Sequence, residues 1–261
     1  GDVLRTALHY HPPINIRPAS KDAGVSDMFP WRNDEVWDTR FDITNTASLV
    51  FSDAAPEDTI TLVLFAMGGR ELARHTFALA PFEVRPIVIG DYLPEGAGPA
   101  GTFSVFHSAP AVASRLRATG THLAERGYLS FKRKQDDLWS SVHGNLHALS
   151  MSPSGTMDYA HGRLDKVLPY RIQCRFDDCR RFEMTFTNPS PEEREMEVIL
   201  FDVNRTKIGR QVLKIAPRGL GLFTWDNQEA SCAMVEGRGS MFYWRPAIFK
   251  HYDTHFNILH S

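Results

Sequence analysis

The amino-acid sequence predicts an all-β protein in which an antiparallel β-sandwich occurs twice in tandem, with a long loop insert between the copies. Three observations support this fold class. One stretch of the chain repeats without gaps, apolar residues alternate with polar ones at a period of two, and short apolar runs are separated by turn residues. A strand points successive side chains to opposite faces, so this pattern is typical of half-buried strands in sandwiches or small barrels.

The repeat is clearest between residues 64–81 and 200–217. Both segments begin with Leu-Phe, carry Arg at the same offset and end with Ala-Pro. Residues 60–112 align without a gap on residues 196–248, and a unit of roughly 100 residues is a whole small domain. We therefore predict that one domain is duplicated in tandem. The identical pairs are Leu64/Leu200, Phe65/Phe201, Arg74/Arg210, Ala80/Ala216, Pro81/Pro217, Gly101/Gly237, Ser104/Ser240, Phe106/Phe242, Pro110/Pro246 and Ala111/Ala247.

In chain order, each unit begins with a strand that ends in Thr-Asn, over residues 41–45 and 184–188. The runs TLVLFAM and EVILFDV come next and predict central strands, because they are more continuously apolar. Gly-Gly at 68–69 and Asn-Arg at 204–205 then predict hairpin turns.

The second half of each unit continues the same pattern. A strand alternates up to an Ala-Pro turn, and a further apolar strand follows. The next strand is predicted over residues 101–108. Residues 109–126 have a helical composition, but the aromatic and β-branched residues at the matching positions of the second copy favour a strand over residues 111–117.

These patterns divide the chain into four parts. They are an N-terminal arm (residues 1–27), a first sandwich (28–126), an inter-repeat insert (127–165) and a second sandwich (166–261). The arm and the insert have no counterpart in the repeat. Because a long segment without a packing role is often functional, the insert is where we expect the site.

Composition excludes several classes of function. The chain has 261 residues, a net charge of −2 and a pI near 6.6, so we expect no basic surface that attracts nucleic acid. No apolar run approaches the roughly 20 residues that span a bilayer, and the first residues lack the pattern of a signal peptide. Three cysteines fit a reducing compartment better than a disulfide framework. We therefore expect a cytoplasmic protein without a nucleic-acid partner or a membrane span.

The strand phrases ITN (43–45), TLVLF (61–65) and FALAP (77–81) carry a resemblance to a known family. Each repeat resembles the sensory rhodopsin transducer family of small bacterial β-sandwich proteins over roughly 70 residues. The resemblance implies the fold and a tendency to form homo-oligomers, and it brings no enzymatic motif. The whole chain also resembles uncharacterised bacterial proteins that accompany surface-polysaccharide genes.

The insert is dense in side chains that bind ligands. Aromatic rings pack against the C–H faces of sugars, and planar polar groups bind their hydroxyls. Trp31, Trp37, Tyr243 and Trp244 add further aromatic candidates outside the insert. The predicted ligand-binding residues of the insert are Trp139, His143, Asn145, His147, Tyr159 and Arg163.

The leading expectation is that no metal or cofactor is bound, and zinc or another divalent metal is the alternative. On a helix, His143 and His147 would share a face, and His161 or His107 would complete a three-histidine site with an open position. The turn-like Gly144-Asn145 between them disfavours that helix, and the HExxH pattern is missing. A second candidate cluster, at the C-terminal end, contains His251, Asp253, His255 and His260.

The GxSxG elbow of nucleophilic catalysis is missing, and so is the P-loop that binds nucleotide phosphates. The acidic pairs at 136–137 and 177–178 are adjacent, which suits a glycosidase pair poorly. We therefore predict a non-catalytic binding or structural protein that recognises carbohydrate in bacterial surface-polysaccharide metabolism, with an oligosaccharide or a protein as partner. The alternatives are a metal-dependent enzyme that uses the insert histidines and an oligomeric signalling protein.

Overall fold

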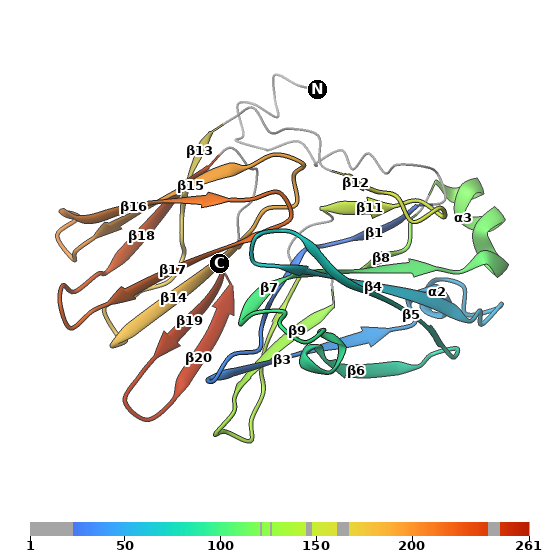
Figure 1. Cartoon of the computed structure of the whole chain (residues 1–261), viewed down its shortest axis with the longest axis horizontal. Helices are drawn as coiled ribbons and strands as arrows, with labels where there is room; N and C mark the ends of the chain where they lie inside the picture. The colour runs from blue at the N-terminus through green and yellow to red at the C-terminus, as the bar shows by residue number, and fades with distance from the viewer. Residues whose placement is uncertain are drawn as a thin grey trace.

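The computed structural model describes residues 23–120, 122–125, 127–144, 148–160, 167–239 and 246–260. Within these ranges the chain is mostly β-strand, and five four-stranded sheets form (Figure 1). The all-β prediction is therefore confirmed. Most of the predicted N-terminal arm lies outside the described residues.

Eight strands build the first sandwich. They are β2 (Phe29–Arg32), β3 (Trp37–Thr44), β4 (Asp58–Ala66), β5 (Glu71–Leu79), β6 (Val84–Val88), β7 (Ala100–Ser108), β9 (Tyr128–Arg133) and β10 (Ser140–His143). One sheet has the order β2-β7-β4-β5 and the other β10-β9-β3-β6. The alternating burial of β3 reflects its sequence, in which every second residue from Trp37 onward is buried.

Eight more strands build the second sandwich. They are β13 (Leu168–Arg171), β14 (Arg181–Thr187), β15 (Arg194–Phe201), β16 (Lys207–Ile215), β17 (Leu220–Asp226), β18 (Met234–Gly239), β19 (Ala247–His251) and β20 (Phe256–His260). One sheet has the order β13-β18-β15-β16 and the other β17-β14-β19-β20. In Figure 1 the two sandwiches lie side by side.

A smaller fifth sheet covers the outer face of the first sandwich, with the order β12-β11-β1-β8. Its apolar side chains and those of β4 and β7 form one buried cluster: Met28, Val63, Phe65, Phe106, Ala148, Leu149 and Met157. The short helices lie in the connections of the first sandwich. These elements are β1 (Gly24–Ser26), β8 (Ala124–Glu125), β11 (Leu149–Met151), β12 (Met157–Tyr159), α2 (Thr46–Val50), η1 (Ile89–Tyr92), η2 (Pro110–Val112) and α3 (Ala113–Thr119).

The two sandwiches share strand order and local backbone features. Strands β4 and β15 occupy equal places in their sheets, and each has a register shift against the next strand, after Leu64 and after Leu200. The turn before the third matched strand has a left-handed residue in both copies, Phe82 at φ 61° and Arg218 at φ 60°. These matches support the alignment of residues 60–89 with 196–225. Tandem duplication itself remains a prediction from the sequence.

The alignment is wrong beyond that point. In the first sandwich Leu64 of β4 pairs with Phe103 of β7, whereas in the second Leu200 of β15 pairs with Val235 of β18. Gly101 and Gly237 therefore do not occupy equal positions. Pro110 begins η2, while Pro246 directly precedes β19. The strand predicted over residues 111–117 is also wrong, because this segment forms η2 and α3, as its composition favoured.

The first half of the predicted insert belongs to the first sandwich. Strand β9 pairs with β3, and β10 pairs with β9, just as β19 and β20 extend from β14 in the second sandwich. In the first copy, η2, α3 and β8 lie between β7 and β9. The long connection of the first copy therefore comes before β9 and β10. The sequence boundary at residue 126 therefore separates two strands from their own sheet.

Cores form between the sheets, and one of them crosses the junction between the sandwiches. Trp37 packs with Phe249 and Phe256 of the second sandwich, with ring centroids 5.0 Å apart in both pairs. The fifth sheet also explains a difference between matched residues. Phe65 is fully buried beneath it, whereas Phe201 is only half-buried, since the fifth sheet covers the first sandwich alone. The junction positions the strands that carry the candidate site.

Candidate functional site

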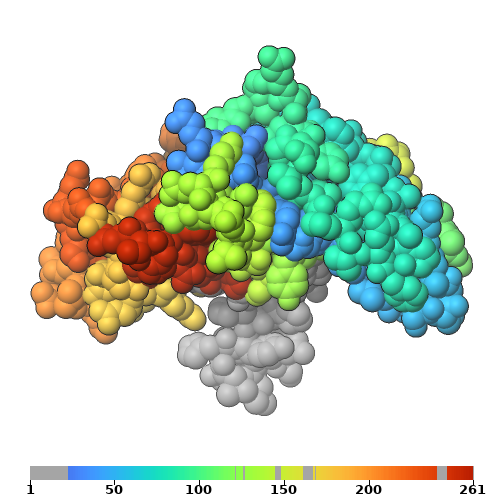
Figure 2. Space-filling model, turned by 90° about the horizontal axis from the view of Figure 1, so that it is seen from below, coloured from blue at the N-terminus to red at the C-terminus, as the bar shows by residue number. Residues whose placement is uncertain are grey.

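Two hairpins at the junction line an open cavity of about 640 Å³, which is within the usual size of small-ligand sites. One hairpin is the β9–β10 turn of the first sandwich, and the other is the β19–β20 turn of the second. Figure 2 shows these two segments, yellow-green and red, against each other in the middle of the molecule. We call this cavity the hairpin pocket. Its lining residues are Arg133, Gln135, Asp136, Asp137, Leu138, Trp139, Ser140, Thr254, His255 and Phe256.

Trp139 is the aromatic side chain that the first hairpin contributes. It is half-buried and lies just before β10. The guanidinium of Arg40 lies 5.0 Å from its ring centroid, and the ammonium of Lys132 lies 5.4 Å away. Cations over an indole hold it by electrostatic attraction to the ring. The ring is therefore fixed in place at the pocket wall.

The polar lining comes from the same turn. Nε of Arg133 donates to Asp136 at 2.6 Å, and the backbone N–H of Asp136 donates to the carbonyl of Arg133, which closes the turn. Within the described residues, the carboxylate of Asp137 and the amide of Gln135 make no hydrogen bond or ion pair. Both groups are exposed. They are free to bind a ligand's hydroxyl groups.

The opposite wall comes from the second hairpin. The rings of Tyr252 and His255 stack, with centroids 4.4 Å apart and planes at 8°. The Phe256 ring is covered by the guanidinium of Arg133, 4.9 Å from its centroid. The contact between Arg133 and Phe256 joins the two hairpins and holds the two walls of the pocket together.

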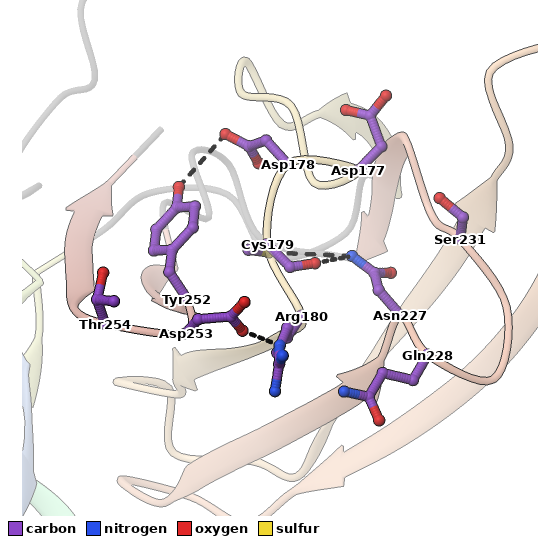
Figure 3. A pocket seen from close by; sticks show the side chains of 10 residues that line it. All are labelled: Asp177, Asp178, Cys179, Arg180, Asn227, Gln228, Ser231, Tyr252, Asp253 and Thr254. Atoms are coloured by element: carbon purple, nitrogen blue, oxygen red, sulfur yellow. Dashed lines mark hydrogen bonds and ion pairs between the residues drawn. The ribbon is translucent and has the colours of Figure 1, made fainter.

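A second cavity, of about 600 Å³, lies on the far side of the β19–β20 turn and shares Thr254 with the hairpin pocket. Figure 3 shows its acidic side chains, and each is already paired. Asp253 pairs with Arg180, Asp178 with Lys250 and with the hydroxyl of Tyr252, and Asp177 with Arg175. These ion pairs tie loops of the second sandwich together. The paired carboxylates leave this cavity less suited to a ligand than the hairpin pocket.

The thiol in that second cavity is not a nucleophile. Burial raises the pKa of Cys179 to about 11, and its sulfur donates to the carbonyl of Phe176 at 3.2 Å. A nucleophilic cysteine needs a thiolate near neutral pH. Cys174, Cys179 and Cys232 are all free thiols. The segment from Gly96 to Gly101 has GxGxxG spacing, but it leads into β7 without a following helix, so it lacks the context of a dinucleotide site.

The predicted site residues do not gather at one place. Trp139 lines the hairpin pocket, whereas His143 lies at the other end of β10 and contacts His260. Tyr159 lies on β12 in the fifth sheet, where burial raises the pKa of its hydroxyl above the usual value. The predicted residues Asn145, His147, His161 and Arg163 lie outside the described residues, as do Tyr243 and Trp244.

Several residues of the pocket have no sequence signal that places them beside Trp139. Asp136 and Asp137 stand out only as an adjacent pair, and His255 belongs to the candidate C-terminal metal cluster. Phe256 and His255 also lie more than a hundred positions along the chain from Trp139. The usable signal is the repeat itself, because matched β-hairpins in two copies of one fold place their turns on the same side of each copy. Recognising β9 and β10 as the partners of β19 and β20 would have pointed to both turns.

No group of three or more histidine, cysteine or acidic side chains is arranged to hold a metal in the described part of the chain. Among those residues, no helix has the length and apolar character needed to cross a bilayer. Comparison of the chain with protein-family models finds no match, and comparison with curated proteins finds no significant match.

Proposed function

We propose that this chain is a non-catalytic binding protein that takes a carbohydrate in the hairpin pocket. The observation that carries the proposal is Trp139, an indole held half-exposed at the wall of a pocket of ligand size. An aromatic ring covers the apolar C–H face of a sugar. The neighbouring Gln135 and Asp137 then accept and donate hydrogen bonds with its hydroxyl groups.

The charge of the pocket favours a neutral sugar. Arg133 is already paired with Asp136, and the carboxylate of Asp137 remains open among the described residues. An acidic sugar would meet that carboxylate, and like charges at close range are unfavourable. The two cations beside the lining, Arg40 and Lys132, lie over the Trp139 ring. A neutral oligosaccharide, such as a fragment of a surface polysaccharide, is therefore the expected ligand.

The arrangement favours binding over hydrolysis. Glycosidases place two carboxyl groups on either side of the bond that they cleave, at separations of about 5–10 Å. Here both lining carboxylates, Asp136 and Asp137, come from one turn, and Asp136 is engaged by Arg133. The opposite hairpin contributes a hydroxyl, an imidazole and a phenyl ring to the lining.

Trp139→Ala is expected to weaken binding of a neutral oligosaccharide at least ~10-fold, because an anchoring aromatic commonly dominates the energy of a site. The measurement is a screen of immobilised neutral and acidic glycans, followed by calorimetric titration of each hit. Tyr128→Ala is the matched control, since Tyr128 is 62% exposed on the same sheet but does not line the pocket. Unchanged affinity in Trp139→Ala, or binding of acidic glycans alone, would remove the proposal.

A further inference from the structure

Two histidines face each other where the sandwiches meet. His143 ends β10 and His260 ends β20. His143 pairs with the first residue of β9, Tyr128, and His260 pairs with the first residue of β19, Ala247. The two histidines therefore hold the same place in the two sandwiches, and each reaches its counterpart across the junction.

Their imidazole rings are close enough to share a single ion. The two Nε2 atoms are 2.9 Å apart, and the ring centroids are 4.1 Å apart with planes at 71°. Rings that aimed their nitrogen atoms straight at each other would have more widely separated centroids, so at least one ring is tilted away from the line between the two Nε2 atoms.

The protonation of His143 suits a metal ligand. Its Nδ1 lies 2.7 Å from the carbonyl oxygen of Gly144, and a carbonyl can only accept, so Nδ1 carries the proton. The lone pair of neutral His143 is then on Nε2, which faces His260. Metal-binding histidines commonly donate their other ring N–H to a backbone carbonyl, which fixes the tautomer and the ring orientation.

We propose that His143 and His260 bind a divalent transition metal of the zinc, copper or nickel class between their Nε2 atoms. With metal–nitrogen distances of about 2.0–2.1 Å and a tetrahedral angle, the two nitrogens would be about 3.3–3.4 Å apart. In the 2.9 Å contact Nε2 of His260 donates to Nε2 of His143, so metal binding requires that His260 carry its proton on Nδ1 instead and that side-chain rotation separate the two nitrogens slightly. Imidazole suits these metals, whereas magnesium and calcium prefer oxygen.

The site would link the two sandwiches. His143 is exposed, so an ion reaches the pair from solvent. Among the described residues, no third histidine, cysteine or acid joins the pair. This site lies at the opposite ends of β10 and β20 from the hairpin pocket, so it does not depend on carbohydrate binding.

The test is titration of zinc chloride and nickel chloride into the metal-free full chain, followed by calorimetry and by the midpoint of thermal unfolding. The parent protein is expected to bind one metal ion that His260→Gln removes, and its midpoint is expected to rise with metal concentration by mass action. His143→Gln and His260→Gln should each weaken binding at least ~10-fold, because each removes one of two ligands. His75→Gln is the matched control, since His75 lies on β5 with its Nε2 2.8 Å from the carbonyl oxygen of Tyr92, outside the pair and the hairpin pocket, and the variant should bind metal like the parent.

Two results would overturn the metal site. The first is a parent protein whose midpoint and heat signal do not respond to either metal, which would identify the pair as a histidine–histidine hydrogen bond. The second is a His260→Gln variant that binds like the parent while His143→Gln does not, which would assign the metal to other histidines. Thermal midpoints measured in chelator test whether both variants fold, and they are expected to stay close to that of the parent because glutamine retains a hydrogen-bonding group at each position.

Discussion

Glu183→Ala is expected to lower the free energy of unfolding by about 3–5 kcal/mol, the usual cost of breaking a buried ion pair from one side. The Glu183 side chain is only 4% exposed and accepts from Nη1 of Arg32 at 2.8 Å and from Nε2 of His251 at 2.8 Å. Arg32 belongs to the first sandwich, whereas Glu183 and His251 belong to the second. The variant leaves a buried guanidinium across the junction with Asp34 as its remaining partner.

The pKa of Glu183 is consistent with this role. Burial raises the pKa, but the hydrogen bond from His251 and the charges of Arg32 and Arg181 outweigh burial and lower it. The carboxylate is therefore kept ionised within the junction. Its charge is what neutralises Arg32, which also lies over the rings of Trp37 and Phe249.

Urea unfolding of the parent and of three variants measures the effect. Glu192→Ala is the matched control, because Glu192 pairs with Arg194 at the surface with 70% of its side chain exposed, and such a pair contributes at most about 1 kcal/mol. The double variant Arg32→Met/Glu183→Leu removes both charges and should cost less than Glu183→Ala alone. If Glu183→Ala and Glu192→Ala unfold at the same urea concentration, the junction does not depend on this ion pair.

The second large expected effect is that the protein loses stability as the pH rises into the alkaline range, because of His107. His107 is buried on β7, with Nδ1 2.7 Å from a carboxylate oxygen of Asp58 and Nε2 2.8 Å from one of Glu125. Burial lowers the pKa of this imidazole, but the hydrogen bonds and charges of the two carboxylates outweigh burial and raise it to about 9. Glu125 lies on β8, so the triad ties the fifth sheet to the first sandwich.

The direction of the pH effect follows from proton binding. An unfolded histidine titrates near 6.5, so below that pH both states are protonated and the stabilisation is complete. Between about pH 6.5 and 9 the folded state holds a proton that the unfolded state has lost, and raising the pH therefore favours unfolding. The parent should lose about 3 kcal/mol of stability across this window, since each unit of pKa difference is worth about 1.4 kcal/mol.

His107→Gln is the control for this window. Glutamine does not titrate, so the difference in unfolding free energy between parent and variant should shrink as the pH rises from 6.5 to 9. Taking the difference between parent and variant cancels the contribution of the cysteine thiols to the pH dependence, because both proteins contain them. These thiols titrate in the unfolded state at the upper end of the range. Parallel curves for the two proteins would show that the His107 proton is not linked to folding.

The sequence by itself determined the strands and turns that depend on neighbouring residues. The alternation in β5 and β16, the shared turn before residues 84 and 220, and the matched positions of Leu64 and Leu200 were all predicted. Consecutive side chains determine which face of a strand is buried and which dihedral angles a turn adopts, so a local sequence pattern predicts both. The sequence also selected Trp139, which lines the hairpin pocket, because an aromatic residue among polar ones is a local signal; its role in ligand binding stays a prediction.

The tertiary structure alone decided which segments meet. Residues 111–117 are helical, as their composition favours, but only the structure shows that β9 and β10, further along the chain, extend the sheet from β3. Phe65 is buried and Phe201 is not, since only the first sandwich carries the fifth sheet. His143 and His260 are 117 positions apart, and the hairpin pocket joins turns separated by a similar distance. Contacts of this kind depend on how whole sandwiches pack, which short-range periodicity does not encode.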